Sequence, residues 1–255
     1  MSNVRFTGTK LANTNKKGIL KPDEDGYYEM IIGGLNTFNS AGEYYTLEGA
    51  KALFEESSIF MRRVRNSSLY AEYAHPKKLP NMSMDQYINR ILSIDENNVC
   101  CHIKEVWLDE TYGKKHPELN NPALVAIMAK VKPYGPKGVH LKESIENPSQ
   151  NTSFSIRALT NDFYQRGQTV RVLQQIVTFD ACVSEPGIAI ATKFQSPGLE
   201  SSSDFSDFTV TRAQIERVAY QNNSFVGTED SKLLVKECLK AFEVKQAPKP
   251  IYHSW

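Results

Sequence analysis

The stretch Thr152–Leu159 constrains the fold of this chain more than any other segment. It is a short run of apolar and hydroxyl-bearing residues with Ser155 near its middle, and this mixture is typical of a β-strand. Side chains alternate along a strand with a period of two, so Ser153 and Ser155 point to the same face. A second apolar run, Ile176–Val183, contains one acid, Asp180. We therefore expect two strands whose polar side chains need partners.

The remaining segments predict more strands than helices. Strands are expected over Tyr27–Ile32 (ended by Gly33 and Gly34), Ser58–Arg65, Ser68–Tyr73, Val99–Leu108, Ala123–Val131, Phe154–Leu159 and Arg171–Val183. Helices are expected over Thr46–Glu56, Met84–Leu92, His140–Ile145 (a single turn), Thr211–Tyr220 and Asp230–Phe242. The almost wholly apolar run Ala123–Val131 indicates a central strand. Because no βαβ alternation is present, the predicted class is α+β, mostly β, with peripheral helices.

The ends of the chain differ in composition from its middle. Residues 1–25 are polar and rich in lysine, which favours an irregular arm or a weak hairpin. Gln195–Phe205 is rich in Ser, Gly, Pro and Asp and is interpreted as a linker. We therefore expect a main domain over residues 1–197 that includes the N-terminal arm. Residues 198–255 would hold the linker, the C-terminal helices and a loose tail.

Bulk properties exclude several classes of protein. The 255 residues have a formal net charge of +1, whereas a nucleic-acid partner calls for a strongly basic face. No run of eighteen apolar residues is present, so no membrane span is expected. The four cysteines are few and irregularly spaced, which suits a reducing cytoplasm.

Two smaller clusters have ordinary explanations. Cys100, Cys101 and His102 are metal-ligand types, but neighbouring strand residues face opposite sides and no second Cys/His pair completes a zinc site. We expect core cysteines there, and neither a metal nor a cofactor. Arg62, Arg63 and Arg65 form a basic cluster, which is interpreted as a solvated edge or a docking face.

A histidine and a serine could form the nucleophilic part of a hydrolytic site. A serine hydroxyl needs a neighbouring base, and histidine is the usual one because its pKa lies near neutrality. Among five histidines, His75 has the most suggestive setting, between the small Ala74 and the strand-ending Pro76. The residues alone favour plainer explanations: a strand-end histidine, and surface hydroxyls at Ser153 and Ser155.

Asp180 is the strongest candidate for a third member. An acid inside an apolar run is costly to bury unless it is paired. It could orient a histidine, or it could form a structural salt bridge with Arg157 or Arg171. The residues alone leave both roles open.

Three blocks of the sequence resemble the prohead, or head-maturation, proteases of tailed bacteriophages, which are related in fold to herpesvirus assemblins. Leu69–Pro76 is similar to their motif of a small residue, histidine and proline, and Ser153–Ala158 to their nucleophile strand. Val177–Pro186 is similar to a strand that contains Phe-Asp and ends at a proline. The resemblance covers about Tyr27–Pro197. It implies an assemblin-like β-barrel core with surrounding helices, and a triad of Ser155 (nucleophile), His75 (base) and Asp180.

The resemblance also implies a function. The chain would be a serine endopeptidase that cleaves scaffold, internal and capsid precursor proteins inside the viral prohead, in the host cell cytoplasm. It would process itself, with Glu200 and Glu243 as candidate cleavage points, and some relatives activate by dimerising. No cofactor, nucleic acid or membrane is implied.

Two departures from the family pattern concern the oxyanion hole. Phe154 and Ala158 stand where the family often has glycine, and the loop Pro186–Ile188 is our candidate donor. They keep open a second hypothesis, that the chain is a catalytically inactive structural or scaffolding head protein with the same fold. A different hydrolase, such as an esterase, is disfavoured because no Gly-x-Ser-x-Gly motif is present.

Overall fold

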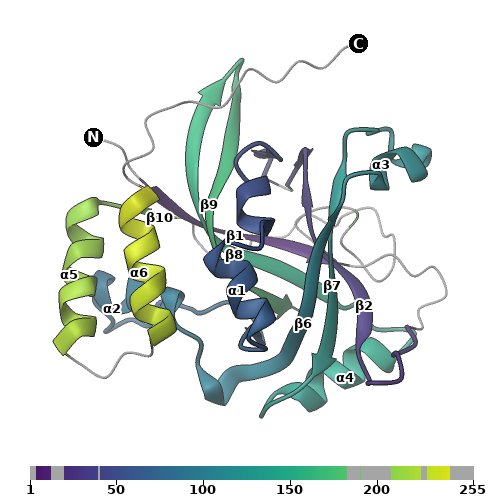
Figure 1. The fold of residues 1–255 in the computed structure, drawn as a ribbon, viewed down its shortest axis with the longest axis horizontal. Coiled ribbons are helices and arrows are strands. Elements are labelled where there is room, and N and C mark those ends of the chain that lie inside the picture. Colours follow the sequence, from purple (N-terminus) through teal and green to yellow (C-terminus); the bar gives the residue numbers. More distant parts are fainter. Residues whose placement is uncertain are drawn as a thin grey trace.

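The computed structural model describes residues 4–12, 20–39, 41–182, 190, 208–224 and 229–241. Their strands form a six-stranded sheet, in the order β10-β1-β8-β9-β4-β3, and a four-stranded sheet, in the order β2-β7-β6-β5 (Figure 1). The strands are β1 Val4–Ala12, β2 Tyr28–Leu35, β3 Thr37–Phe38, β4 Tyr44–Tyr45, β5 Tyr70–Glu72, β6 Val99–Asp109, β7 Val125–Pro133, β8 Ser153–Gln165, β9 Gln168–Cys182 and β10 Phe208–Val210. The helices are α1 Ile59–Arg65, α2 Met84–Leu92, α3 Tyr112–Lys115, α4 Gly138–Glu146, α5 Arg212–Ser224 and α6 Glu229–Ala241.

The hairpin of β8 and β9 dominates the six-stranded sheet. The two strands pair antiparallel from Ser153 opposite Cys182 to Gln165 opposite Gln168. Its turn residues Arg166 and Gly167 have φ of 51° and 81°, a geometry that matches the twist of a hairpin. The tip extends beyond the rest of the sheet (Figure 1). Both predicted strands are confirmed within the described residues, and both extend further toward their shared turn.

The N-terminal segment is a strand, which corrects the expectation of an irregular arm. β1 pairs antiparallel with β8, from Arg5 opposite Thr160 to Ala12 opposite Ser153, and with β10 on its other side. β8 offers partners to the backbone N–H and C=O groups along one side of β1, and β10 offers them to Val4–Phe6 on the other side. Pairing of this kind depends on residues far away in the sequence, so the local polar composition did not reveal it.

The four-stranded sheet contains the predicted central strand, because β7 pairs with both β2 and β6. The prediction that Gly33 and Gly34 end the strand expected over Tyr27–Ile32 was wrong. That strand is β2, which continues to Leu35 through a bulge between Ile31 and Gly33. A Cβ atom at Gly33 would lie 2.6 Å from Ile127 Cδ1. Glycine therefore permits close approach of two strands here and does not end one.

Side chains from both sheets share one hydrophobic core, to which α1 and α4 also contribute. An isolated bridge between Tyr73 and Ala181 connects the end of β5 to β9. In the described part of the chain the strands nevertheless remain two sheets, and the expected closed β-barrel is not formed. The class is mixed α+β with mostly strands.

Ser58–Arg65 is helix α1, which corrects the prediction of a strand. Ser58 caps the helix by accepting a hydrogen bond from the backbone N–H of Met61 at 3.0 Å. Phe60 and Val64, four residues apart, are both buried and so lie on the same helical face.

The helix expected over Thr46–Glu56 is reduced to a 3-10 turn at Lys51–Phe54. Gly49 interrupts it with φ of 87°, outside the helical region. The predicted helix Met84–Leu92 is confirmed as α2, with a capping box between Ser83 and Gln86. The turn expected over His140–Ile145 is part of the longer α4.

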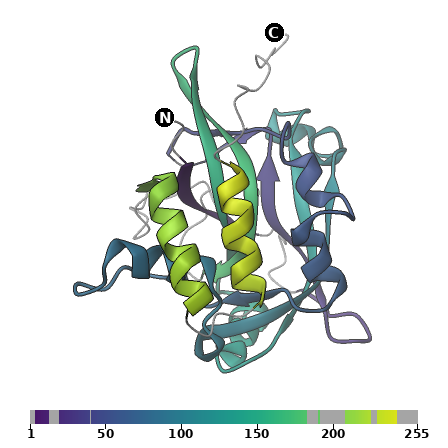
Figure 2. The ribbon, with the colours of Figure 1, turned by 60° about the vertical axis from the view of Figure 1, so that its left-hand side comes forward.

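The two predicted C-terminal helices are confirmed as α5 and α6, and Thr211 and Gln214 form the expected capping box. The helices lie side by side (Figure 2). Their buried side chains pack against α2 and against Leu159 and Val177 of the six-stranded sheet. The expected linker lies outside the described residues, and the division of the chain at residue 197 stays a prediction. No helix in the described ranges is long and apolar enough to span a membrane.

Candidate active site

The β8–β9 hairpin places a serine directly opposite an acid. Ser155 pairs with Asp180 across the hairpin. Arg157 follows Ser155 by two residues and therefore lies on the same face of β8. All three residues are fully buried. The register of one hairpin thus assembles a hydroxyl, a carboxylate and a guanidinium inside the protein.

His75 reaches this cluster from the end of β5. The bridge between Tyr73 and Ala181 is followed by a hydrogen bond of 2.7 Å from Ala74 N–H to Ala181 O. Ala74 has φ of 66°, in the left-handed region, which turns the chain after β5. These contacts fix His75 next to Asp180.

The His75 ring connects the carboxylate to the hydroxyl. Nδ1 lies 2.8 Å from Asp180 Oδ2, and an ionised carboxylate only accepts hydrogen bonds, so Nδ1 carries the hydrogen. Nε2 is hydrogen-bonded to Ser155 Oγ and accepts the hydroxyl hydrogen when the ring is neutral. This is the order of contacts in a Ser-His-Asp triad. The structure therefore brings together the three residues that were singled out in the sequence.

Arg157 holds the Asp180 carboxylate from the other side. Its Nε donates to Oδ2 at 2.8 Å and its Nη2 to Oδ1 at 2.6 Å, a bidentate pair. Burial works to raise the pKa of the Asp180 carboxyl, but the Arg157 guanidinium and the hydrogen bond from His75 outweigh it, and the pKa is lowered. Asp180 thus makes both contacts considered for it, a hydrogen bond with a histidine and a salt bridge, and the cation of the salt bridge is Arg157. Arg171 pairs instead with Glu43 at 2.6 Å.

Comparisons with known proteins identify the family of this chain. The Peptidase S80 family matches residues 6–238, most of the chain. The chain belongs to the Peptidase S80 family. The capsid maturation protease of Pseudomonas phage phiKZ is 41% identical to it over 224 residues, 84% of this chain and 80% of that protein. The solved capsid assembly protease of bacteriophage T4 matches with a TM-score of 0.49 and 11% identity, over 70% of this chain and 98% of that one; membership of the family does not depend on it.

This Peptidase S80 chain contains a second charged pair behind Arg157, which the sequence analysis missed. Glu72, on β5, accepts a hydrogen bond of 3.0 Å from Arg157 Nη2. Arg90, on α2, binds the two oxygens of Glu72 in a bidentate pair. The signal in the sequence was weak: one acid in a short strand, and one arginine on a helix that is otherwise buried through apolar residues.

The positions where phage head-maturation proteases often have glycine are core positions in this chain. Phe154 and Ala158 are both fully buried and pair across the hairpin with Ala181 and Ile176. The loop Pro186–Ile188, our candidate donor to the oxyanion, lies outside the described residues.

The cysteines of β6 are core residues, as predicted. Cys100 and Cys101 are both fully buried, and burial raises the pKa of the Cys100 thiol. His102 bonds to the Tyr27 hydroxyl at 3.0 Å and to Ser67 O at 3.2 Å. Among the described residues, no group of three or more His, Cys, Asp or Glu side chains is arranged to hold a metal ion.

The expectation of one exposed basic cluster on Ser58–Arg65 was wrong in part. Arg62 and Arg65 are exposed, but Arg63 is buried and donates to Val177 O. The helix explains the difference, because Arg62 and Arg65, three residues apart, lie on one helical face and Arg63 does not.

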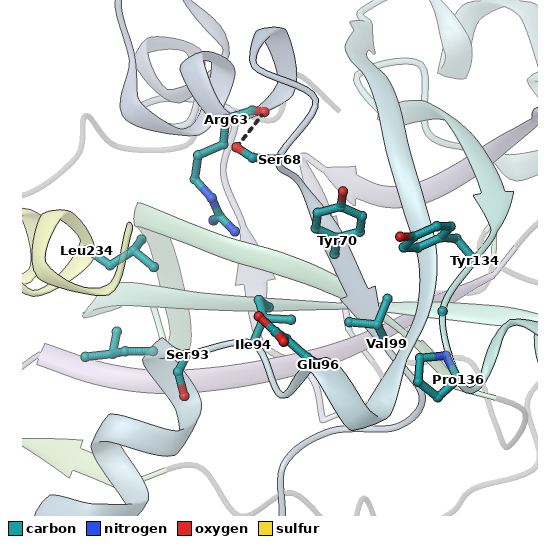
Figure 3. A pocket seen from close by; sticks show the side chains of 12 residues that line it. Arg63, Ser68, Tyr70, Ser93, Ile94, Glu96, Val99, Tyr134, Pro136 and Leu234 are labelled. Carbon is teal, nitrogen blue, oxygen red and sulfur yellow. Dashed lines mark hydrogen bonds between the residues drawn. The ribbon is translucent and has the colours of Figure 1, made fainter. Parts of the chain in front are cut away.

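A pocket of about 450 Å³ lies between side chains of several elements (Figure 3). The rings of Tyr70 and Tyr134 form one side, with centroids 5.6 Å apart. Arg63 and Leu234 lie on the opposite side (Figure 3). Ser93 lines the pocket, and its carbonyl accepts a hydrogen bond from Arg157, which in turn binds Asp180. The pocket's lining residues do not include the triad, so it is a neighbour of that site.

Proposed function

We propose that this peptidase is a serine endopeptidase of the Ser-His-Asp type that matures the capsid of a bacteriophage. The observation that carries the proposal is the continuous hydrogen-bond chain from Ser155 Oγ through His75 to Asp180. In this order of contacts the ring nitrogen that faces the serine is the acceptor, as general-base catalysis requires.

The reaction has two halves. His75 Nε2 takes the hydroxyl proton while Ser155 Oγ attacks the peptide carbonyl carbon, and the carbonyl oxygen becomes an oxyanion. The C–N bond then breaks as the same nitrogen gives its proton to the leaving amine. Water, deprotonated by His75, attacks the acyl-enzyme, and the second tetrahedral species collapses to a free acid and the Ser155 hydroxyl.

Asp180 acts by remaining ionised throughout. Its lowered pKa keeps it negative at neutral pH, so it stabilises the imidazolium that forms when the ring takes the proton. Arg157 fixes the carboxylate, which leaves Oδ2 aligned with His75 Nδ1. Because the His75 ring is already held in place, it does not have to be ordered during the reaction, and the entropic cost of the reaction is lower.

The proposed substrates are scaffold, internal and capsid precursor proteins inside the prohead, in the host cytoplasm. Support comes from the relative named a capsid maturation protease. Self-processing and a homodimer belong to the same proposal, as does kinship in fold with herpesvirus assemblins. The candidate cleavage points Glu200 and Glu243 lie outside the described residues.

A fluorophosphonate probe with intact mass spectrometry tests the nucleophile. The Ser155 hydroxyl should displace fluoride and gain one phosphonyl group, and Ser155→Ala should take no label. Ser153→Ala is the matched control: it is equally buried, lies on the same face of the same strand, and should label normally. Labelling that persists in Ser155→Ala would reject the assignment.

Cleavage of the natural substrate tests the function itself. The wild type should cut the capsid precursor of its own phage at defined bonds, and Ser155→Ala should leave it intact. One observation favours the alternative of an inactive head protein, namely that Ser155 is fully buried. A chain that neither labels nor cleaves under assembly conditions would establish that alternative.

A further inference from the structure

Glu72 is a fully buried carboxylate to which the proposed reaction assigns no role. Its Oε1 accepts hydrogen bonds from Arg90 Nη1 at 2.9 Å, from Arg157 Nη2 at 3.0 Å and from Asp95 N–H at 3.0 Å. Its Oε2 accepts from Arg90 Nη2 and from Asn98 Nδ2. All of these partners donate, so the group functions as a carboxylate anion.

Arg157 transmits the position of Glu72 to the triad. A guanidinium has five N–H donors in a rigid fork. In Arg157 they bind the Asp180 carboxylate twice, Glu72 once, and the carbonyls of Ile91 and Ser93. The backbone N–H of Glu72 also donates to Asp180 Oδ1 at 3.2 Å. Glu72 therefore contacts Asp180 through its backbone and through one shared guanidinium.

The charges of this cluster balance only when Glu72 is included. The carboxylates of Asp180 and Glu72 offset the guanidiniums of Arg157 and Arg90. Without Glu72, the charges of Arg157, Arg90 and Asp180 would sum to a net positive charge, which Asp95, 3.9 Å from Arg90 but 42% exposed, offsets only weakly because water screens it. Such a charge opposes the imidazolium that forms when His75 takes a proton, and it acts strongly because the cluster is shielded from water.

We propose that Glu72 is a positioning residue of this active site: it orients the Asp180 carboxylate through Arg157, and its charge lets His75 accept the proton of Ser155. The inference rests on the proposed function, since it assigns His75 the role of base. Arg90 completes the arrangement by binding Glu72 through both oxygens.

Two other titratable groups near the His75 ring do not supply the negative charge that Glu72 supplies. Burial raises the pKa of Tyr87 on α2 and of Cys100 on β6, so both are neutral at neutral pH. His140 on α4 stacks on the Tyr73 ring, with centroids 5.6 Å apart. Among the described residues, the groups that face His75 or its partners include Asp180 (β9), Arg157 and Ser155 (β8), Glu72 (β5), Arg90 and Tyr87 (α2), Cys100 (β6), Asp95, Tyr73 and His140.

The test compares two charge removals in the full chain, the isosteric Glu72→Gln and the shortening Arg90→Gln. The second-order rate of fluorophosphonate labelling is measured against pH. Glu72→Gln should lower the maximal rate by about 10- to 100-fold, as loss of a supporting partner does at other sites. The acidic limb of the pH–rate profile of Glu72→Gln should move to lower pH, by about 0.5–1 unit, because a negative charge near the His75 ring is lost. Arg90→Gln should move the same limb to higher pH.

Opposite movement of the two limbs separates this role from a structural one. A purely structural role would lower the amount of folded protein and leave both limbs at the wild-type pH, and that result would overturn the proposal. Glu72→Asp, which retains the charge, should restore the wild-type limb. If Glu72→Gln does not fold, Arg90→Gln, at a half-buried residue, still tests the proposal through the direction in which its acidic limb moves. Glu43→Gln is the matched control, because it removes the acid from another buried arginine pair and should change neither rate nor limb.

An NMR titration of the His75 ring gives a readout that does not need catalysis. Its midpoint should fall in Glu72→Gln and rise in Arg90→Gln. If the wild type takes no label but these midpoints move as stated, the proposed function fails and the positioning role stands. If the wild type takes the label and the His75 midpoints of the two variants equal that of the wild type, the positioning role fails while the proposed function stands.

Discussion

At the scale of single residues, Ala74 is the position where backbone strain meets the active site. Of the described non-glycine residues with positive φ, Ala74 alone has an apolar side chain. The left-handed region costs such a residue about 1–2 kcal/mol, and glycine removes most of that cost while it loses more entropy on folding. We therefore expect Ala74→Gly to raise the free energy of unfolding by about 0.5–1 kcal/mol in urea titrations.

Ala71→Gly provides the comparison, since Ala71 lies in the same strand, is fully buried and does not have positive φ. It should lower stability by about 1 kcal/mol or more. Equal losses in the two variants would show that Ala74 stores no strain.

The sequence identified single residues of the site better than their mutual contacts. Ser155, His75 and Asp180 were singled out through the resemblance, and the hairpin register explains why two of them meet. The residues alone left Arg157 and Arg171 open as partners of Asp180, because the choice depends on the register of β8 against β9, which strand periodicity does not give. Glu72 was missed because its partners come from α2, β8 and loop backbone, which no local pattern connects.

At the scale of elements, the C-terminal helices share a hydrophobic cluster with the β8–β9 hairpin. Leu234 of α6 is buried among side chains of α2 and β9. Leu234→Ala should lower the free energy of unfolding by about 2–4 kcal/mol. Hydrogen exchange should show that the slowest amides of α6 and of β8 lose protection together. Leu233→Ala, at a half-buried neighbour, should cost about 1 kcal/mol or less. Loss of protection in α6 alone would instead support an independent C-terminal unit.

The elements that were predicted correctly have a local cause, and those that were missed do not. α2 has both a capping box and a buried apolar stripe, and each is readable from nearby residues. α1 is only seven residues long, so its two buried apolar residues, Phe60 and Val64, are equally compatible with a strand. β1 owes its form to β8, some 150 residues away, and polar composition gave no sign of that pairing.

At the scale of the whole molecule, folding places four charged groups in the interior and neutralises them against one another. Buried ion pairs contribute little net stability, but removal of one member is costly, because its partner stays charged without compensation. The arrangement is therefore better explained by its position behind His75 than by stability. These groups are desolvated beside His75, the ring to which the proposed function assigns the proton transfer.

This burial makes the stability of the whole chain depend on acid. The pKa of Asp180 is lower in the folded chain than its unfolded value near 3.9. Its contribution to stability is thus fully present above pH ~4 and is lost as the pH falls through the folded pKa. The gap in free energy of unfolding between wild type and Asp180→Asn should shrink as the pH falls below ~4, by about 1.4 kcal/mol for each unit by which the pKa is lowered. Urea titrations from pH 2 to 7 measure it, with Ser155→Ala as the control, because that variant removes a neighbouring hydroxyl and no charge. A gap for Asp180→Asn that stays constant down to pH 2 would mean that Arg157 does not stabilise the ionised carboxylate, and the account of a permanently charged Asp180 would fail with it.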